Sequence, residues 1–462
     1  MNTYTDKFFK NIYGKKVAFL GIGKSNMPLI KMFHQKGAKV IACDRSNREK
    51  ILNEALELES LGVELRLGES YLENLDVDII FRTPGMRFSI PELNKAHKNG
   101  IVVTSEMEIF FELCPCKIIG ITGSDGKTTT TSIISEILKH SGKTVHLGGN
   151  IGTPLLSRIE NIKEDDIAVV ELSSFQLISM RKSPDIAVVT NLEPNHLDMH
   201  KDMAEYIDAK KNILLHQNAF SKTVLNLDNE ITSKFSDSCR GQTLFFSTKK
   251  ECENGAFVDV DTIYMSIKGK KTPIMKTSDI KIPGKHNVEN YLAAICAVFG
   301  LVSIEDIIWT AKNFAGVEHR TEFVREKNGV KYFNDSIASS PTRTISGTLS
   351  LHDNKIILIA GGYDKKIPFD KLGPVISNKV KLLILMGQTA NKIETAVRNS
   401  SAYEKNNPKI VTVKNMEEAV NAAYRSAVSG DIVSLSPACA SFGLYKNFEE
   451  RGKHFKKLVN EL

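Results

Sequence analysis

The chain has 462 residues, enough for about three domains of roughly 150 residues each. Its composition (42% hydrophobic, 25% charged) is that of a globular protein, and its net charge of +7 is too small and too dispersed for a nucleic-acid-binding stripe. The seven cysteines are irregularly spaced, and Cys114 and Cys116 form C-x-C rather than the C-x-x-C of redox and zinc sites, so we expect free thiols. There is no signal peptide and no apolar run of about 18 residues, which predicts a cytoplasmic protein that does not associate with membranes.

The first segment alternates short apolar runs with helical patterns, which predicts a parallel sheet. A helix is expected over residues 26–37, ending at Gly37, and strands are expected at KVAFLGIG, KVIACD, VDIIFRTPG and GIVVTS. The turn Gly21-x-Gly23, with Asp44 at the end of the second strand, is compatible with dinucleotide binding, in which such an acid contacts a ribose. The third glycine position holds Asn26, so this signal is weak.

The stretch GITGSDGKTTTT, residues 120–131, predicts a phosphate-binding loop between a strand and a helix. Its spacing departs from G-x-x-x-x-G-K-[ST], because the residue five before Gly126 is Ile121. A glycine turn that merely caps a helix is the alternative, but backbone N–H groups and the positive helix end can hold phosphate here. Lys127 can approach the β- and γ-phosphates and the Thr128 hydroxyl can ligate Mg²⁺. The predicted nucleotide-binding residues are Gly123, Ser124, Asp125, Gly126, Lys127, Thr128 and Thr129.

Two later strands end in polar residues. Glu171 follows the apolar run IAVV, and ligands of open parallel sheets bind beyond such strand ends, so we predict a Mg²⁺ ligand rather than a solvated carboxylate. After the strand DIAVVTN, the alternation of His196, Asp198 and His200 also admits zinc. We favour His196 as a ligand of a second Mg²⁺ or as a neighbour of the reacting phosphate.

The remaining chain continues the same alternation. Residues 235–280 are polar with little periodicity, and NVENYLAAICAVFGL then predicts an amphipathic helix. A third unit opens at FAGVEHRTEFV, with strands expected at KIILIAGGYDK, VKLLILMG, KIVTV and DIVSLSPACAS. The predicted fold class is therefore α/β, in three successive domains.

A set of motifs spread over essentially the whole chain resembles the Mur ligases of peptidoglycan synthesis. In chain order they are GITGSDGKTTT, GGNIGTP, ELSSFQL, TNLEPNHLDMH, YIDAKKNI, GKHNVEN, FAGVEHR, NDSIASSPTRT, AGGYDKK and SPACASFGLYKNFEERG. The phosphate loop and the HN and HR pairs are shared by all Mur ligases, and the tail is more specific to the D-glutamate-adding member. The chain departs from the pattern at Ile337, where some members have lysine, and at Gly443, where an acid is common.

The resemblance implies a Rossmann-like N-terminal domain over 1–114 that binds the UDP part of a substrate, a central P-loop α/β domain over 115–316 that binds ATP, and a Rossmann-like C-terminal domain over 317–462 that binds an amino acid. The implied reaction joins D-glutamate to UDP-N-acetylmuramoyl-L-alanine (UDP-MurNAc-L-Ala) through an acyl phosphate, with ATP and two Mg²⁺ ions, in a monomer. Phosphoryl transfer is needed because a carboxylate does not react with an amine until it carries a leaving group. Lys127 and Mg²⁺ would supply the positive charge that this transfer requires.

Site roles can be carried over from the family to the central domain. Lys127 and Thr128 would bind ATP and metal, Glu171 would hold Mg²⁺, and Asn150 and His196 would line the reacting centre. In YIDAKKNI the register makes Lys210 the lysine that CO₂ carbamylates, with Lys211 as the fallback and a solvated helix lysine as the alternative. An unmodified ammonium would be repelled by Mg²⁺, by about 4 kcal/mol per unit charge at roughly 4 Å and an effective dielectric of roughly 20.

The resemblance also implies ligand contacts elsewhere. Asn287 and Asn290 would contact adenine, with helix capping by Asn287 as the alternative, while Arg320 would lie near the nucleotide and Asp335 would reach the ATP ribose on domain closure. The residues implied for the UDP substrate are Ser25, Asn26, Asp44, Arg45, Gly85, Asn150 and Ser173, and those for D-glutamate are Lys365, Ser441, Phe442 and Phe448, with Lys366 not separable from Lys365. Two other classes stay open: an NAD(P)-dependent oxidoreductase that uses the first unit, and a nucleotide-regulated binding protein.

Overall fold

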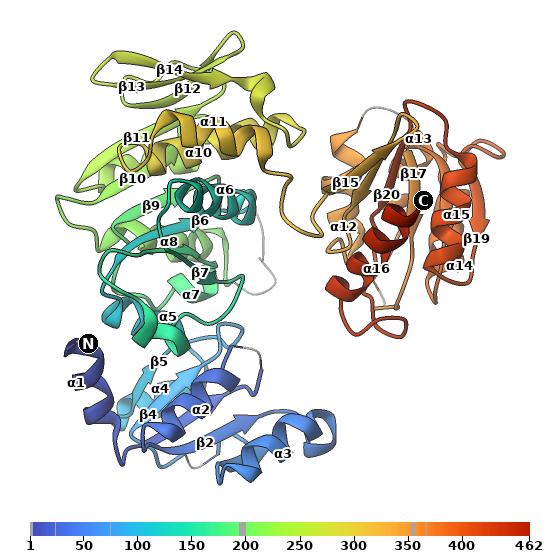
Figure 1. Cartoon of the computed structure of the whole chain (residues 1–462). Coiled ribbons are helices and arrows are strands. Elements are labelled where there is room, and N and C mark those ends of the chain that lie inside the picture. Colours follow the sequence, from blue (N-terminus) through green and yellow to red (C-terminus); the bar gives the residue numbers. More distant parts are fainter. Residues whose placement is uncertain (1–2, 24, 74, 194–199, 353–355, 366) are drawn as a thin grey trace. The chain divides into compact units, whose positions relative to one another are not determined.

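The computed structural model of the chain describes residues 3–23, 25–73, 75–193, 200–352, 356–365 and 367–462. The chain divides into two compact units (Figure 1): unit 1 comprises Met1–Ile280 and Lys285–Asn313, and unit 2 comprises Lys281–Gly284 and Phe314–Leu462. Unit 1 contains a five-stranded and a nine-stranded sheet, and unit 2 contains a six-stranded sheet. The predicted α/β class is confirmed.

The first sheet of unit 1 is fully parallel, in the order β3-β2-β1-β4-β5. Its strands are β1 Lys16–Leu20, β2 Lys39–Asp44, β3 Glu64–Leu67, β4 Ile79–Arg82 and β5 Val102–Thr104; its helices are α1 Thr3–Ile12, α2 Met27–Gln35, α3 Leu52–Ser60, α4 Pro91–Lys98 and α5 Glu106–Leu113. Side chains alternate along β1, so Val17 and Phe19 join one hydrophobic cluster while Ala18 and Leu20 join another. Both faces are therefore covered, as is usual for parallel sheets.

The second sheet of unit 1 has the order β14-β13-β12-β11-β10-β9-β6-β8-β7. Its strands are β6 Lys117–Thr122, β7 Val145–Gly149, β8 Ile167–Glu171, β9 Ile186–Val189, β10 Lys222–Asn226, β11 Gln242–Ser247, β12 Gly255–Asp259, β13 Thr262–Ile267 and β14 Lys270–Lys276. All strands between the edge strand β7 and β12 in this order, including β6, run parallel. β13 and β14 add an antiparallel edge within the stretch where no element was predicted. Because β6 lies between β8 and β9, the strand order reverses there, and ligands bind at such a point.

The helices of the second sheet include one that differs from its prediction. They are α6 Lys127–His140, α7 Ser174–Leu177, α8 Met203–Leu215, α9 Glu230–Ser233, α10 Lys285–Val298 and α11 Ile304–Asn313. The helix expected to be amphipathic is α10, but every residue from 290 to 298 is buried. The prediction was wrong because α10 packs against α6 on one side and against β10 to β12 on another, and a helix enclosed in this way is apolar all round.

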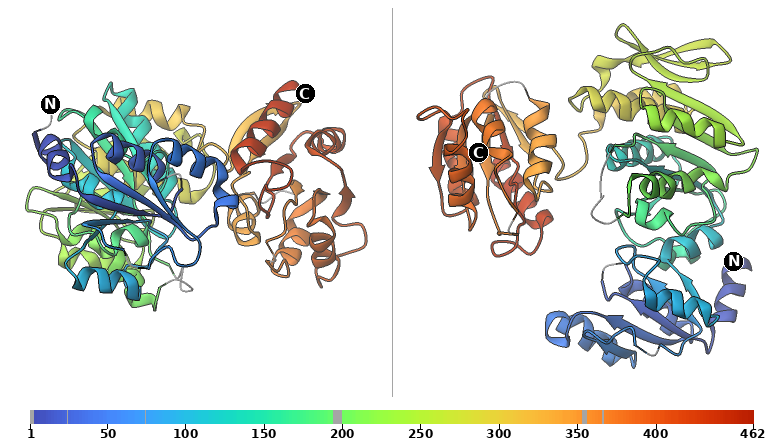
Figure 2. Two further views of the ribbon diagram at one scale, coloured as in Figure 1. Left: turned by 90° about the horizontal axis from the view of Figure 1, so that it is seen from below. Right: turned by 180° about the vertical axis from the view of Figure 1, so that it is seen from behind.

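The sheet of unit 2 has the order β15-β16-β20-β17-β18-β19, in which only β15 is antiparallel to its neighbour. Its strands are β15 Glu322–Lys327, β16 Val330–Asn334, β17 Ile356–Ala360, β18 Val380–Leu385, β19 Lys409–Thr412 and β20 Ile432–Leu435; its helices are α12 Pro341–Thr344, α13 Leu372–Lys379, α14 Ala390–Arg398, α15 Met416–Ser426 and α16 Phe448–Glu461. Ile356 and Leu358 of β17 pack with α13 and α14, and Ile357 and Ile359 pack with α15 and α16. Helices thus cover both faces of this sheet (Figure 2).

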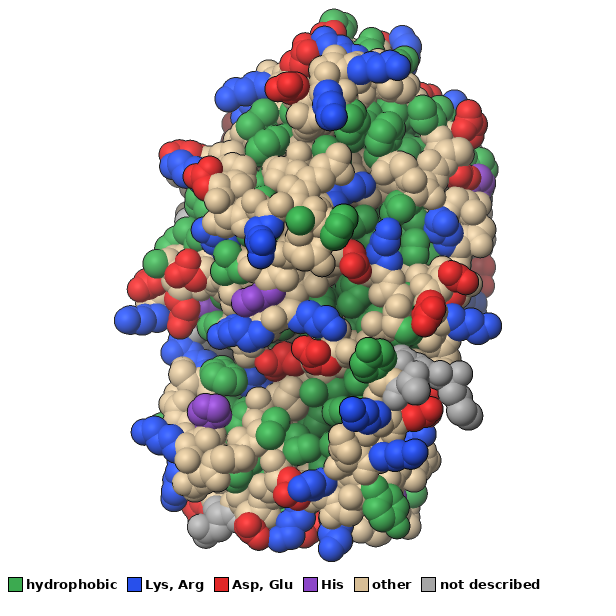
Figure 3. Space-filling model, turned by 90° about the vertical axis from the view of Figure 1, so that its left-hand side faces the viewer, with side chains coloured by type: hydrophobic (Ala, Val, Ile, Leu, Met, Phe, Trp, Pro, Cys, Tyr) green, Lys and Arg blue, Asp and Glu red, His purple; other side chains and the backbone are tan. Residues whose placement is uncertain are grey.

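The surface carries charges of both signs. On the face drawn in Figure 3, basic and acidic side chains are interspersed, and neither sign forms a continuous stripe. Among the described residues, no helix has both the length and the apolar composition that crossing a membrane requires.

Candidate active site

The predicted phosphate loop joins the carboxyl end of β6 to the N-terminus of α6, a helix of 14 residues. Gly123 and Gly126 have φ values of +150° and +78°. A Cβ at Gly123 would lie 1.9 Å from Thr190 Oγ1, and one at Gly126 would lie 2.4 Å from Asn290 Oδ1, so neither position has room for a side chain. The loop therefore presents its backbone N–H groups and the positive end of α6 together, which suits a phosphate anion.

Side chains from the segment after β9 and from α8 hold this loop. Asn191 Oδ1 accepts from Asp125 N at 2.9 Å, and Thr190 Oγ1 donates to Asp125 O at 2.6 Å. Ser124 Oγ lies 2.8 Å from Tyr206 Oη, a buried group on α8. These bonds fix the loop before any ligand is present, and such preorganisation lowers the cost of binding.

Two lysines donate to carbonyl oxygens of the loop. Lys127 Nζ lies 2.8 Å from Gly123 O and 2.7 Å from Ser124 O. Lys210 Nζ lies 2.8 Å from Gly123 O and 3.3 Å from Thr122 Oγ1. Lys210 is 2% exposed, and its burial, with the nearby charge of Lys127, holds the pKa of its amine well below the usual range. A depressed pKa favours the neutral amine, which is the form of lysine that reacts as a nucleophile.

Glu171, at the end of β8, is a buried carboxylate with one unused oxygen. It is 1% exposed, and its Oε1 accepts from Asn150 Nδ2 at 2.7 Å. Its Oε2 is also buried and has no hydrogen-bond partner among the described residues. Its backbone lies so close to β7 that a Cβ at Gly149 would be 2.2 Å from Glu171 O. A buried carboxylate oxygen that receives no hydrogen bond can bind a cation. Glu171 and the hydroxyl group of Thr128 are therefore suitable ligands for Mg²⁺.

The histidine group after β9 is described only in part. His196 and Asp198 lie outside the described residues, so their predicted roles stay predictions. His200 is buried, and its ring stacks on Phe175 at a centroid distance of 5.0 Å. Its Nε2 lies 2.8 Å from Ser174 Oγ and its Nδ1 lies 3.2 Å from Glu205 Oε2. Both ring nitrogens of His200 are thus used within the protein.

Five of the seven residues predicted to bind the UDP substrate lie at or after the ends of β1, β2 and β4 of the first sheet, around its switch point between β1 and β4, whereas Asn150 and Ser173 follow β7 and β8 of the second sheet. Asp44 accepts backbone N–H groups from the loops after β1 and β2, each at 2.7 Å. Asn26 donates to two backbone carbonyls at the end of β1, at 3.0 and 3.1 Å. Ser25, Arg45 and Gly85 are exposed. Asp44 and Asn26 support the loop, while the exposed three are open to a ligand.

Three other predicted contact residues are engaged inside unit 1. Ser173 begins α7 with a capping box, in which its Oγ accepts from Gln176 N at 3.3 Å. Asn290 Oδ1 accepts from Thr130 Oγ1 at 3.2 Å, and Asn290 Nδ2 donates to Asn287 Oδ1 at 3.0 Å. Because α10 begins at Lys285, Asn287 lies inside the helix, and the capping alternative is wrong. The contacts of these residues with ligands stay predictions.

In unit 2, the residues predicted to bind D-glutamate follow the adjacent strands β17 and β20. An isolated bridge pairs Tyr363 with Ala440 and so holds the loop of Lys365 beside that of Ser441. Phe442 is 53% exposed and meets the Tyr363 ring edge-on at 6.0 Å. Lys366 lies outside the described residues.

Asp335, predicted to reach the ATP ribose, points into unit 2. Its carboxylate is 3% exposed and accepts from Thr321 N at 3.2 Å, Thr348 Oγ1 at 3.0 Å and Ser436 Oγ at 2.8 Å. Burial raises the pKa of Asp335 to about 6, against the effect of these donors and of the Arg320 charge. The ribose contact and the nucleotide contact of Arg320 stay predictions.

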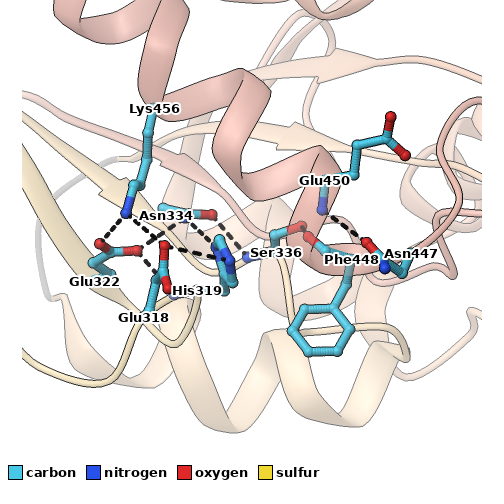
Figure 4. A network of polar contacts seen from close by, with 9 residues as sticks. All are labelled: Glu318, His319, Glu322, Asn334, Ser336, Asn447, Phe448, Glu450 and Lys456. Atoms are coloured by element: carbon cyan, nitrogen blue, oxygen red, sulfur yellow. Dashed lines mark hydrogen bonds and ion pairs between the residues drawn. The ribbon is translucent and has the colours of Figure 1, made fainter. Parts of the chain in front are cut away.

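A polar network ties α16 to the beginning of unit 2 (Figure 4). His319 has a φ of +64°, and its Nδ1 lies 2.9 Å from Asn334 Nδ2. Lys456 of α16 donates to Glu322 Oε1 at 2.7 Å. Phe448, also on α16, meets the His319 ring edge-on at 5.9 Å. The position of Phe448 therefore depends on residues more than a hundred positions earlier in the chain.

Arg82 and Arg451 are the two largest fully buried side chains among the described residues, and neither was predicted to be a functional residue. Arg451, on α16, donates from Nε to Ser336 Oγ at 3.0 Å and from Nη2 to Ser336 O at 2.8 Å. Both of its terminal nitrogens donate to Cys439 O at 3.1 Å. Arg451 thus joins α16 to the segments after β16 and β20. Arg451 lies in the quoted motif SPACASFGLYKNFEERG, but nothing in that motif indicates that the arginine is buried, because an arginine on a C-terminal helix is ordinarily exposed.

Three family models match the chain: the MurD-like N-terminal domain of Mur ligases over residues 15–105, the Mur ligase middle domain over 121–298 and the Mur ligase glutamate ligase domain over 319–439. The chain belongs to the Mur ligase family. Similar relatives include the proteins named UDP-N-acetylmuramoylalanine--D-glutamate ligase of Acetivibrio thermocellus, 54% identical, and of Clostridium botulinum, 52% identical, each aligned over 100% of both chains.

Solved structures of Mur ligases share the fold. UDP-N-acetylmuramate-alanine ligase MurC of Thermotoga maritima is 18% identical, with a TM-score of 0.59 over 97% of this chain and 99% of that one. MurF of Acinetobacter baumannii is 15% identical, with a TM-score of 0.58 over 97% of this chain and 93% of that one. The predicted family and its three-domain fold are confirmed.

Proposed function

We propose that this Mur ligase joins D-glutamate to UDP-MurNAc-L-Ala with ATP, releasing ADP and phosphate, as a cytoplasmic monomer in peptidoglycan precursor synthesis. One observation carries the proposal: a phosphate loop, a buried carboxylate with an unused oxygen and a buried lysine with a depressed pKa meet at the carboxyl edge of one sheet. This set supplies the anion and cation positions that phosphoryl transfer needs. The choice of D-glutamate follows the names of relatives that match over the full length.

The proposed division of labour follows the three sheets. We assign residues 1–114 to the UDP substrate, 115–316 to ATP and 317–462 to D-glutamate. The strands of the three sheets fall within these ranges, at 16–104, 117–276 and 322–435. Closure of the C-terminal domain would bring Arg320 and Asp335 to the nucleotide and keep water from the acyl phosphate.

In the proposed first step, the muramyl carboxylate attacks the γ-phosphorus and the bond to ADP breaks. The loop N–H groups hold the phosphates, and Lys127 exchanges its two carbonyl acceptors for phosphate oxygens. Thr128 and Glu171 would hold Mg²⁺, with Asn150 orienting the Glu171 carboxylate. When bound, Mg²⁺ offsets the charge on the β- and γ-oxygens.

In the second step, the amine of D-glutamate attacks the acyl carbon, and phosphate leaves the tetrahedral intermediate after the amine has lost its proton. Lys365, Ser441, Phe442 and Phe448 would hold the incoming amino acid, because the bridge between Tyr363 and Ala440 keeps two of these segments together. Lys365 offers the positive charge that a dicarboxylic amino acid requires.

Lys210 is the proposed site of carbamylation. Its neutral amine would add to CO₂ and lose a proton, which gives a carbamate anion in place of a cation beside the loop and makes Lys210 a further metal ligand. The alternative of a solvated lysine is wrong for Lys210, whereas Lys211, the fallback, lies over the Phe235 ring at 5.6 Å. Incubation with ¹³C-bicarbonate should give a carbamate carbon resonance that is missing from Lys210→Met but present in Lys211→Met.

The deciding experiment measures phosphate release with ATP, Mg²⁺ and UDP-MurNAc-L-Ala against a matrix of amino acids. D-glutamate should give the highest rate, and a higher rate with L-lysine or diaminopimelate would overturn the choice of amino acid. With ¹⁸O in the muramyl carboxylate, the released phosphate should carry one labelled oxygen. Unlabelled phosphate would exclude the acyl phosphate.

A further inference from the structure

Arg82 ends β4 and bridges two segments of unit 1. It is 1% exposed, and its Nη1 donates to Met86 O at 3.1 Å, in the turn that contains Gly85. Its Nη2 donates to Ser179 Oγ at 2.6 Å and to Phe175 O at 3.2 Å. One guanidinium therefore holds the turn after β4 against α7 and the residue two positions beyond its end.

The bonding of Arg82 is unusual for a stabilising contact. Its acceptors are two backbone carbonyls and a hydroxyl, and its buried Nε has no hydrogen-bond partner among the described residues. Burial lowers the pKa of the guanidinium, and Glu108 provides the opposing charge. Because burying a cation in this way adds little net stability, the geometry that it imposes is the better explanation of its presence.

Both segments that Arg82 joins lead to the site. The turn Thr83–Met86 lies at the switch point of the first sheet, where a Cβ at Gly21 would be 3.4 Å from Thr83 Cγ2. α7 begins three residues after Glu171. From α7 the connection continues to α8, because Asn212 Nδ2 donates to the carbonyl oxygens of residues 177 and 178 at 3.0 and 3.3 Å. Lys210 lies two residues before Asn212 on α8.

We propose that Arg82 is a positioning residue that sets the muramyl carboxylate of the UDP substrate against the γ-phosphate. It acts by holding the Thr83–Met86 turn, and with it Gly85, in register with α7 and α8. This inference rests on the proposed function and places Arg82 in contact with neither ATP nor the reacting atoms. Lysine cannot replace it, since an ammonium lacks the planar fork that reaches acceptors in two directions.

The test compares the wild type with Arg82→Met and Arg82→Lys, measuring kcat and the KM of each substrate. Arg82→Met should raise the KM for UDP-MurNAc-L-Ala about 10-fold and lower kcat by up to about 100-fold, because a misplacement of about 1 Å has an effect of that size. The dissociation constant of ATP should stay within about 2-fold, because the phosphate loop is untouched. Arg82→Lys should recover only part of the loss.

Two controls keep the result interpretable. Arg451→Met removes the other buried guanidinium and should raise the KM for D-glutamate, not that for the UDP substrate. Should Arg82→Met fail to fold, Ser179→Ala keeps the guanidinium but removes its 2.6 Å hydrogen bond, together with the hydrogen bond between Ser179 and Glu108, and should raise the KM for the UDP substrate about 5-fold.

Unchanged kinetics in folded Arg82→Met, an equal loss in the affinity for ATP, or an unchanged KM in Ser179→Ala would overturn the role of Arg82. A wild type that releases no phosphate with UDP-MurNAc-L-Ala and D-glutamate would overturn the proposed function instead. The two failures are therefore distinguishable in one data set.

Discussion

The carboxyl edges of the central sheet and of the unit 2 sheet share parallel-strand geometry, but their buried charged groups differ. Glu171 in unit 1 has one oxygen that receives no hydrogen bond from the residues that the structure describes, and Lys210 near it has a depressed pKa. In unit 2, Asp335 takes three donors and all three guanidinium nitrogens of Arg451 are used. The oxygen of Glu171 is therefore open to a charged ligand, whereas the hydrogen bonds of Asp335 and Arg451 hold neighbouring segments of unit 2 together.

Replacing Lys127 with alanine removes the cation of the phosphate loop at the unit 1 edge and should cause the largest loss of activity. Phosphate release should fall by at least about 10³-fold, because phosphoryl transfer depends on positive charge at the β- and γ-phosphates. The carbonyl oxygens of Gly123 and Ser124, to which the Lys127 amine donates, belong to the loop itself, so the far-ultraviolet circular dichroism and the melting temperature should change little. Sustained phosphate release by the variant would remove the loop from the mechanism.

Glu171→Gln tests the unsatisfied carboxylate directly, because it should change activity and stability in opposite directions. The rate should fall about 10²-fold, since a neutral amide is a poorer ligand for Mg²⁺. Without nucleotide and metal, the variant should melt about 2 °C higher, because it no longer buries a charged carboxylate with an oxygen that lacks a donor among the described residues. Gln176→Glu, in the cap of α7, is the opposite change at a nearby site and should lower the melting temperature. A lower melting temperature of Glu171→Gln would show that Oε2 is already stabilised within the protein.

Arg451→Met tests the edge of the unit 2 sheet, where the guanidinium nitrogens all have hydrogen-bond partners. Its loss should raise the KM for D-glutamate about 10-fold while the affinity for ATP is kept, because Arg451 joins the segments that carry Ser441 and Phe448. The melting temperature of unit 2 should also fall, since two buried carbonyls lose their donors at about 1–3 kcal/mol each. Differential scanning calorimetry and substrate titrations measure both effects. An equal rise in the KM values of all three substrates would reduce Arg451 to a general structural role.

Short-range patterns in the sequence were enough to predict the loop between β6 and α6 and the strand that ends at Glu171. Glycines at 123 and 126 followed by Lys127 mark the loop, and the apolar run before Glu171 marks the strand end, whereas Asp335 was named from the family resemblance. Each signal lies within about ten residues, where spacing translates directly into geometry. The hairpin of β15 and β16 carried such a signal too, in Asn328 and Gly329 with φ values of +53° and +75°, and could have been predicted.

Contacts between distant segments were not predictable in this way. Arg82 reaches acceptors 93 and 97 residues away, and Arg451 reaches Ser336 across 115 residues, so nothing near either arginine shows that it is buried. The edge strands β13 and β14 turn through Lys268 and Gly269, a weaker hairpin signal than Asn-Gly. The enclosed face of α10 likewise depends on strands contributed from elsewhere in the chain.

Asp335 provides the test with the smallest expected effect, because its hydrogen-bond donors lower its pKa while its burial raises it. Its folded pKa of about 6 exceeds the ordinary 3.8, so between these values the native state binds the proton more tightly than the unfolded chain does. The wild type should therefore lose stability as pH rises through this window, by up to about 3 kcal/mol at 1.36 kcal/mol per pKa unit. The amide side chain in the variant Asp335→Asn cannot titrate. Urea unfolding between pH 4 and 7 should therefore show that the free energy of unfolding of the variant increases relative to that of the wild type as pH rises. Asp370→Asn, at an exposed aspartate of the same unit, is the matched control. Parallel curves for wild type and Asp335→Asn would mean that the three donors offset the effect of burial on the pKa of Asp335.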